Sequence, residues 1–168
     1  MLARLAGIVA CVALASEAST AFGPRRARRR EIFDRGLAHA RRVGAPLLVV
    51  GDPDTGFVTR FFGRDYGCGD ICTDITGCPR CPSAIKGSAD EVLARLPSRS
   101  HVIAVEYTLE YVSDLPRTIR ELERVAVPGG IYVACVEPGS LTSRFWFGGR
   151  WVLDSAPPRG PWRYRRVR

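Results

Sequence analysis

The stretch VIAVEYTLEYVSDLPRTIRELERVAVPGGIYVACVEP, residues 102–138, decides the fold of this 168-residue chain. Apolar runs at 101–105 and 131–136 predict two buried strands. Between them, residues 114–125 carry apolar side chains at helical spacing, and the Pro-Gly-Gly at 128–130 ends that helix. A strand, a helix and a second strand in this order predict a parallel crossover unit.

The same alternation extends toward the N-terminus. Residues 47–50 are all apolar, which predicts a strand buried on both faces, and residues 70–75 predict another strand. Residues 88–96 predict a short helix, with Ser88 as N-cap and Glu91 at the capping-box position.

We therefore expect one α/β domain over residues 45–158, preceded by an N-terminal apolar helix. Its core is expected to be a Rossmann-like, doubly wound, mostly parallel sheet. Ligands of such sheets bind beyond the carboxyl ends of the strands. Four features should then surround one crevice: the loop at 51–56, Asp74, Ser88 and Glu106.

Residues 46–138 resemble a compact class I S-adenosylmethionine-dependent methyltransferase. The specific match is to the family's fourth strand, the helix that follows it and the fifth strand. It is carried by Leu-Glu-Tyr-Val at 109–112, Glu-Leu-Glu-Arg-Val at 121–125 and Pro-Gly-Gly at 128–130. The resemblance implies S-adenosylmethionine as cofactor and transfer of its methyl group to an acceptor that the residues do not identify.

The resemblance also implies a cofactor loop after the first strand, at 51–56. The family has an acid and then alternating glycines there, which let the backbone approach the cofactor closely. Gly51 and Gly56 remain in this chain, whereas Asp52 and Asp54 stand where glycines are expected. We expect all four at the cofactor, with either aspartate able to replace the missing acid.

Further site residues follow from the same resemblance. Asp74 matches the acid that holds the ribose hydroxyls, a role suited to a charge-assisted hydrogen bond. Ser88 and Ala89 stand in the adenine-contacting segment, where an aspartate is usual. Glu106 is expected at the cofactor and Tyr107 at the substrate, although both also suit a polar strand end. No catalytic residue is assigned, because in-line methyl transfer mainly requires positioning.

Two functions fit these residues. The first is a membrane-tethered enzyme that transfers a methyl group from S-adenosylmethionine. The second is a non-catalytic module of the same fold with a protein partner, such as a virion or envelope component. Asp74 and the match at 109–130 favour the enzyme, whereas the altered loop at 51–56 and the compact length favour the module.

The net charge of +8 is concentrated in the two flanks of the domain. Residues 43–158 hold 11 basic and 14 acidic side chains, whereas residues 23–42 hold eight arginines and residues 159–168 hold five. A nucleic-acid partner is not expected, because the body carries no basic excess. The arginine-rich flanks, including a basic C-terminal tail at 159–168, suit anionic lipid headgroups.

Residues 1–23 predict a membrane anchor or a signal segment, because residues 5–15 contain no polar side chain. Five arginines follow this run closely and only Arg4 precedes it. The positive-inside rule then predicts a single-pass protein whose body faces the cytosol. Cleavage after the Ala-Leu-Ala at 13–15 would instead export the body, and a buried or disordered leader is a third alternative.

Residues 24–44 predict a basic juxtamembrane helix. Its apolar residues fall on one face: Ile32, Phe33, Leu37 and Ala40. This face suits packing on the body, although a solvated helix is an equal alternative. His39 on this helix and His101 at a strand start are expected to pack rather than to catalyse.

The C-terminal part is rich in aromatic side chains. Residues 145–153 predict a hairpin around the two glycines at 148–149. Packing of these aromatic residues on the sheet edge is favoured over a place at a membrane interface.

Four cysteines lie within 14 residues: Cys68, Cys72, Cys78 and Cys81. The two-residue gap between Cys78 and Cys81 suits a pair of zinc ligands. The cysteine pairs lie closer together than in a two-knuckle zinc site, so zinc is a minor alternative, as is a disulfide. We expect mostly free thiols and assign no metal.

Overall fold

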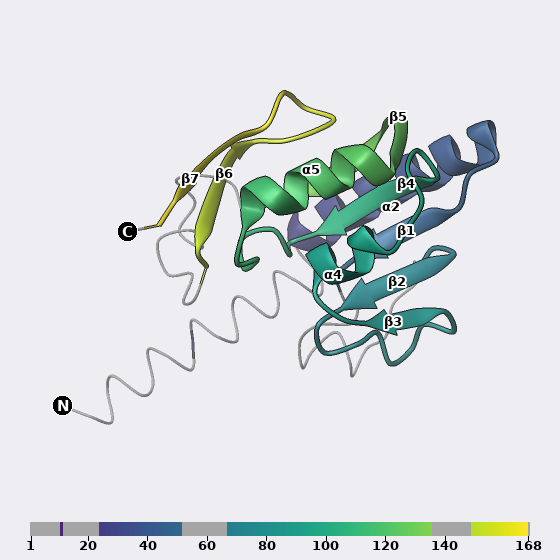
Figure 1. The fold of residues 1–168 in the computed structure, drawn as a ribbon, viewed down its shortest axis with the longest axis horizontal. Helices are drawn as coiled ribbons and strands as arrows, with labels where there is room; N and C mark the ends of the chain where they lie inside the picture. The colour runs from purple at the N-terminus through teal and green to yellow at the C-terminus, as the bar shows by residue number, and fades with distance from the viewer. Residues whose placement is uncertain (1–10, 12–23, 52–66, 136–148, 168) are drawn as a thin grey trace.

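A five-stranded parallel sheet forms the centre of the protein, in the order β3-β2-β1-β4-β5 (Figure 1). The computed structural model describes residues 24–51, 67–135 and 149–167, together with Cys11. The strands are β1 Leu47–Val50, β2 Ile71–Asp74, β3 Ala84–Lys86, β4 His101–Glu106 and β5 Ala126–Ala134. Every neighbouring pair is parallel, which confirms the α/β class and the Rossmann-like sheet.

The central strand β1 explains why the sequence there shows no alternation. All four of its residues are at most 1% exposed. Leu48 and Val50 belong to one apolar cluster, and Leu47 and Val49 belong to the cluster on the opposite face. A strand covered on both sides must be apolar throughout, as parallel sheets require.

Helices α4 (Ala89–Ala94) and α5 (Leu115–Val125) cover one face of the sheet. The backbone N–H of Ser88 donates to the Glu91 carboxylate at 3.2 Å, so the predicted capping pair is present. Asp114 caps α5 by accepting from the Arg117 N–H at 3.0 Å. The Arg124 guanidinium joins the two helices through the Leu93 carbonyl at 2.7 Å.

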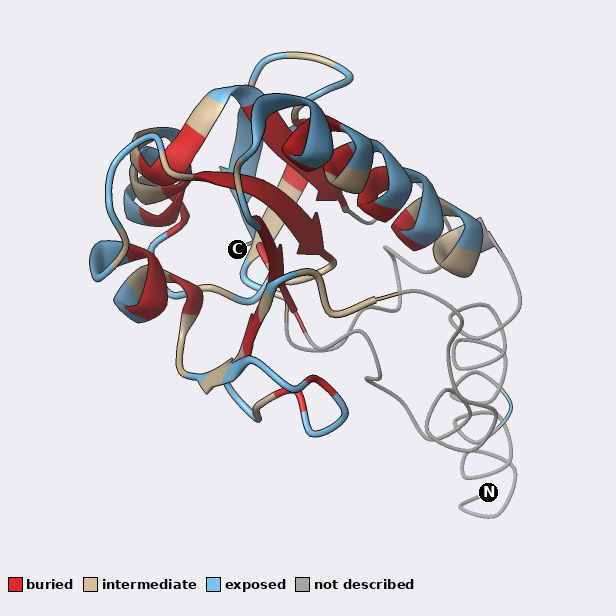
Figure 2. Ribbon diagram, turned by 90° about the vertical axis from the view of Figure 1, so that its right-hand side faces the viewer, coloured by how far each residue is buried: buried red, intermediate tan, exposed pale blue. Residues whose placement is uncertain are grey.

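Helix α2 (Pro24–Val43) covers the opposite face. Ile32, Phe33 and Ala40 are buried, whereas Leu37 is partly buried. Figure 2 shows the buried residues of the helices on the sides that face the sheet. The helix predicted at 24–44 therefore packs on the body, and the alternative of a solvated helix is wrong.

The Pro-Gly-Gly at 128–130 does not act as a simple helix stop. Helix α5 ends at Val125, and β5 begins at once with Ala126. The pairing of β4 with β5 shifts register between His101 and Ile103, and Gly129 adopts a φ of 68°. The motif thus makes an irregular start to a nine-residue strand, which begins before the predicted residue 131.

A two-stranded antiparallel sheet follows, made of β6 (Trp151–Ser155) and β7 (Arg163–Arg166). Residues 145–148 of the predicted hairpin lie outside the described residues. In the described part of the chain, β6 pairs with residues 163–166, so the arginine-rich C-terminus forms a strand. The Trp151 indole N–H donates to the Val112 carbonyl at 2.9 Å, which ties this sheet to the main domain.

The cysteines are joined in two pairs, Cys68 to Cys81 and Cys72 to Cys78. The expectation of mostly free thiols is therefore wrong. Cys72 lies within β2, and the other three cysteines lie in the loops on either side of this strand. Their short spacing permits the pairing but does not specify it.

The predicted anchor at 1–23 lies outside the described residues, apart from Cys11. None of the helices in the described part of the chain is long and apolar enough to cross a membrane.

The two buried histidines make stability depend on pH. Burial, with Arg42 adding repulsion, lowers the pKa of His39, and burial likewise lowers the pKa of His101 against the opposing effect of Asp70. The unfolded chain then takes up protons first as the pH falls below about 6.5, so the free energy of unfolding should decrease between pH 7 and about 5.5.

Urea denaturation at both pH values measures this effect. In His39→Asn the decrease in the free energy of unfolding between the two pH values should be smaller. This variant lacks the titrating imidazole of His39, whose Nδ1 lies 2.9 Å from the Tyr132 hydroxyl. Equal stability at the two pH values, or a gain on acidification, would contradict the assignment.

Candidate functional site

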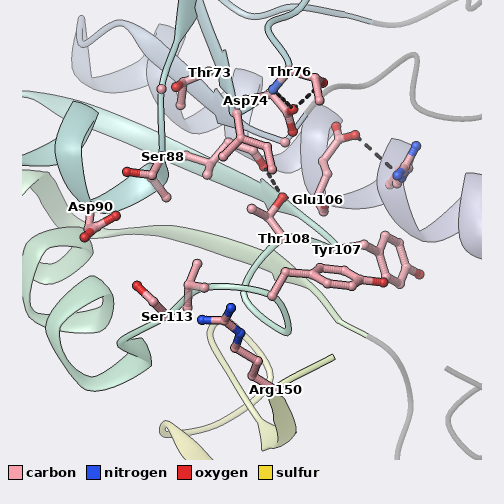
Figure 3. Close-up of a pocket in the computed structure, with 18 residues that line it drawn as sticks. Thr73, Asp74, Thr76, Ser88, Asp90, Glu106, Tyr107, Thr108, Ser113 and Arg150 are labelled. Atoms are coloured by element: carbon pink, nitrogen blue, oxygen red, sulfur yellow. Dashed lines mark hydrogen bonds and ion pairs between the residues drawn. The ribbon is translucent and has the colours of Figure 1, made fainter. Parts of the chain in front are cut away.

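A cavity of about 360 Å³ opens at the carboxyl ends of β1, β2 and β4 (Figure 3). Its size lies within the range of small-molecule sites. The turn before α4, the loop after β4, one residue of α2 and Arg150 complete the wall. The polar residues that line it are Arg29, Thr73, Asp74, Thr76, Ser88, Asp90, Glu106, Tyr107, Thr108, Tyr111, Ser113 and Arg150.

The parallel strand order gathers most of the sequence-predicted site residues around this cavity. They are Gly51, Asp74, Ser88, Ala89, Glu106 and Tyr107. The remaining three, Asp52, Asp54 and Gly56, lie outside the described residues.

Gly51 directly follows β1 and lies close to the backbone at the end of β4. Its N–H donates to the Thr73 carbonyl at 2.8 Å, and its φ is 108°. An added Cβ would meet the Thr108 hydroxyl and lie 2.7 Å from the Glu106 carbonyl oxygen. Glycine is therefore required here by the packing of the strand ends themselves, in addition to any ligand.

Asp74 ends β2 with its carboxylate held in a defined orientation. Its Oδ1 accepts from the backbone N–H of Thr76 at 2.8 Å and from the Thr76 hydroxyl at 2.7 Å. Its carbonyl oxygen accepts from the Gly87 N–H at 3.0 Å, which places the turn before α4 beside it. The result is a charged acceptor group fixed at the edge of the cavity.

Glu106 ends β4 and is paired with an arginine that comes from α2. The Nε of Arg29 lies 3.7 Å from the Glu106 Oε2, and both side chains are buried. Figure 3 shows this pair on the α2 side of the cavity. Removing one partner would leave the other charge buried, so the pair fixes α2 against the strand end.

Tyr107 follows in a left-handed conformation with a φ of 50°, which is uncommon outside glycine and typical of functional sites. Burial raises the pKa of Tyr107 to about 12, although nearby Arg25 and Arg29 oppose this shift. The two guanidinium carbons lie 5.7 and 5.4 Å from the centre of its ring. Tyr107 is therefore neutral at physiological pH, and its ring is already in contact with cations.

Several lining residues were not anticipated from the sequence. In the sequence, Arg29 belongs to a basic flank. Its side chain is buried beside Glu106 only because α2 packs on the sheet. Arg150 is distant in sequence from the strands. Asp90 carried a usable signal, since it is an acid two residues after Ser88 in the predicted adenine segment. Thr73 is 1% exposed, and no described residue forms a hydrogen bond with its hydroxyl.

The chain is an α/β protein with a cavity at the carboxyl ends of its parallel strands, where ligands of such sheets bind. No family model matches the chain, and no solved structure matches it. It is similar to a highly reducing polyketide synthase of Strobilurus tenacellus, with 25% identity over 143 residues. The alignment covers 79% of this chain and 5% of the synthase, so the similarity concerns a segment the size of one domain.

Gly51→Ala tests the close approach of the strand ends, with Gly44→Ala as its control. Both glycines have positive φ, but nothing lies within 4 Å of a Cβ placed at Gly44. Gly44→Ala should lower the free energy of unfolding by about 1 kcal/mol. Gly51→Ala should lower it by about 3 kcal/mol or more, because the clash adds to the backbone cost.

Chemical denaturation of the two variants gives both values. Equal losses would show that the backbone of β4 yields to the added methyl group, and that the strand ends are not tightly fixed.

Proposed function

We propose that the cavity binds S-adenosylmethionine and that the chain is a methyltransferase-like enzyme. One observation carries the proposal. The strand order places four residues around a single cavity: Gly51, Asp74, Ser88 and Glu106. In the sequence, these residues stand at the positions that the methyltransferase resemblance assigns to the cofactor. The similarity to a segment of a polyketide synthase supports an enzymatic role over a purely structural one.

The residues present suit this cofactor. The oriented Asp74 carboxylate is an acceptor for vicinal hydroxyls, and the buried Thr73 hydroxyl beside it offers a further polar contact. Gly51 lines the cavity and allows the ends of β1 and β4 to approach closely there. The cavity wall carries three acidic side chains, Asp74, Asp90 and Glu106, and two arginines, Arg29 and Arg150. The small excess of negative charge favours a bound cation.

Each segment of the site then has a role. Asp74 holds the ribose, and Ser88, Ala89 and Asp90 adjoin the adenine. When bound, S-adenosylmethionine supplies an electrophilic methyl group on a positively charged sulfur. The chain positions the acceptor against it, and this positioning accounts for most of the rate in such transfers. The neutral Tyr107 hydroxyl is a hydrogen-bond donor for the acceptor.

Calorimetric titration of the full chain with S-adenosylmethionine and S-adenosylhomocysteine tests the proposal. Both should bind, and Asp74→Ala should weaken binding about tenfold or more, because a hydrogen bond to a charged group contributes about 1.5–3 kcal/mol. Asp74→Asn should also bind weakly while it keeps an Oδ1 acceptor for the Thr76 turn.

Asp154→Ala is the matched control, since Asp154 lies on β6 outside the cavity and is 43% exposed. It should bind like the unaltered chain. Absence of heat and of any thermal shift with millimolar ligand would reject the enzyme and leave the non-catalytic module.

A further inference from the structure

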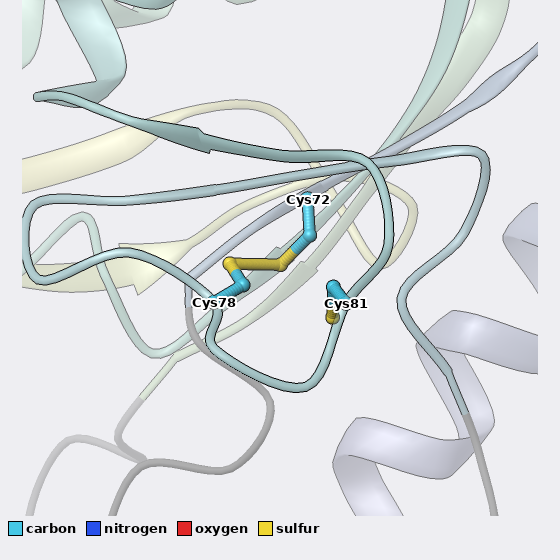
Figure 4. A group of neighbouring side chains, drawn as sticks. All are labelled: Cys72, Cys78 and Cys81. Atoms are coloured by element: carbon cyan, nitrogen blue, oxygen red, sulfur yellow. A yellow bond between two sulfur atoms is a disulfide. The ribbon is translucent and has the colours of Figure 1, made fainter.

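The four clustered cysteines lie at β2, on the same side of the sheet as α2. Figure 4 shows three of them, Cys72, Cys78 and Cys81. Cys72 lies within β2, Cys68 precedes that strand, and Cys78 and Cys81 lie in the loop that leads to β3. Cys72 and Cys78 are at most 1% exposed, and Cys81 is 8% exposed. Cys68 is partly buried, and none of the four cysteines lines the cavity that holds Asp74.

The sulfur atoms are arranged as a group rather than as two isolated pairs. The Sγ atoms of Cys72, Cys78 and Cys81 all lie within 4.8 Å of one another, although Cys81 is bonded to Cys68 and not to either of the others. Cys68 does not belong to this group of three, but its bond to Cys81 places it next to the group. Thiolates that share a zinc ion at about 2.3 Å are separated by about 3.8 Å, so movements of roughly 1 Å suffice for Cys72, Cys78 and Cys81, and Cys68 is the neighbouring cysteine that completes the set.

The backbone supports this arrangement without the sulfur–sulfur bonds. The Cys81 N–H donates to the Cys78 carbonyl at 2.9 Å, which makes a tight turn across the two-residue gap. Cys72 is held in β2 by its neighbours β1 and β3. Thiolate ligands select zinc over magnesium or calcium, and burial of the donors favours a closed structural site.

We propose that the reduced chain binds one Zn²⁺ ion through Cys68, Cys72, Cys78 and Cys81, and that the two disulfides are the oxidised, metal-free form of the same site. Binding converts four thiols and one Zn²⁺ into a tetrathiolate complex and releases four protons. Oxidation by two molecules of a small-molecule disulfide releases the metal. These molecules accept four electrons from the thiolates and four protons to become four thiols, while the cysteines form two disulfides and Zn²⁺ leaves.

The experiment measures bound zinc in the full chain, purified with a phosphine reductant, by atomic emission. About one zinc per chain is expected. Cys72→Ser and Cys78→Ser should each weaken zinc binding by more than about a hundredfold, beyond the loss typical of residues around a metal site. Cys135→Ser is the matched control, because Cys135 directly follows β5 and lies outside the cluster, and it should retain the metal.

Cobalt provides a reading that does not depend on the folding of the variants. Co²⁺ added to the reduced unaltered chain should give the visible absorption of a tetrahedral site and thiolate-to-cobalt charge-transfer bands, and addition of a small-molecule disulfide should abolish both. Three results would overturn the proposal: a reduced, folded chain that binds neither metal; zinc binding that Cys72→Ser leaves unchanged; or disulfides that resist reduction in the folded chain.

Discussion

Burial of β1 on both faces is the constraint on which the rest of the structure depends. A four-residue strand without any exposed surface requires parallel neighbours on each side and a helix layer above and below. Helix α2 forms one layer, and α4 with α5 forms the other. Because all five strands run in the same direction, their carboxyl ends meet at one edge, and the polar residues that follow them share one cavity.

Helix α2 connects the packing to the chemistry of the cavity. Its apolar side covers the sheet, and one of its arginines enters the cavity wall to pair with Glu106. At least one arginine of the basic flank therefore pairs within the protein. The total charge of the flank cannot all be assigned to contacts with lipid headgroups. The same helix contributes residues to the apolar cluster that contains Cys72, Cys78 and Cys81.

Local patterns were sufficient to predict much of this. The strands at 47–50, 70–75 and 101–105, and the cap Ser88, follow from periodicity and from residue types that act over a few positions. The grouping of Asp74, Ser88 and Glu106 followed once a parallel sheet was assumed, because the topology alone brings strand ends together.

Features that depend on long-range contacts were not predictable in this way. Arg29 meets Glu106 only after α2 has packed on the sheet. The pairing of β6 with β7 involves residues 163–166, whose arginines indicate only a tail in the sequence. The cysteine pairing depends on how β2 and the following loop fold back, and a spacing of a few residues is compatible with thiols, zinc or disulfides.

Hydrogen exchange with and without S-adenosylhomocysteine tests the central claim most directly, because it locates the ligand on the sheet. Ligand should slow amide exchange in residues 73–76, 87–91 and 106–113, which contribute to the cavity, and leave the β6–β7 turn at 156–162 unchanged. Unchanged exchange in all three segments, or protection confined to other parts of the chain, would contradict a cofactor site at the carboxyl ends of the strands.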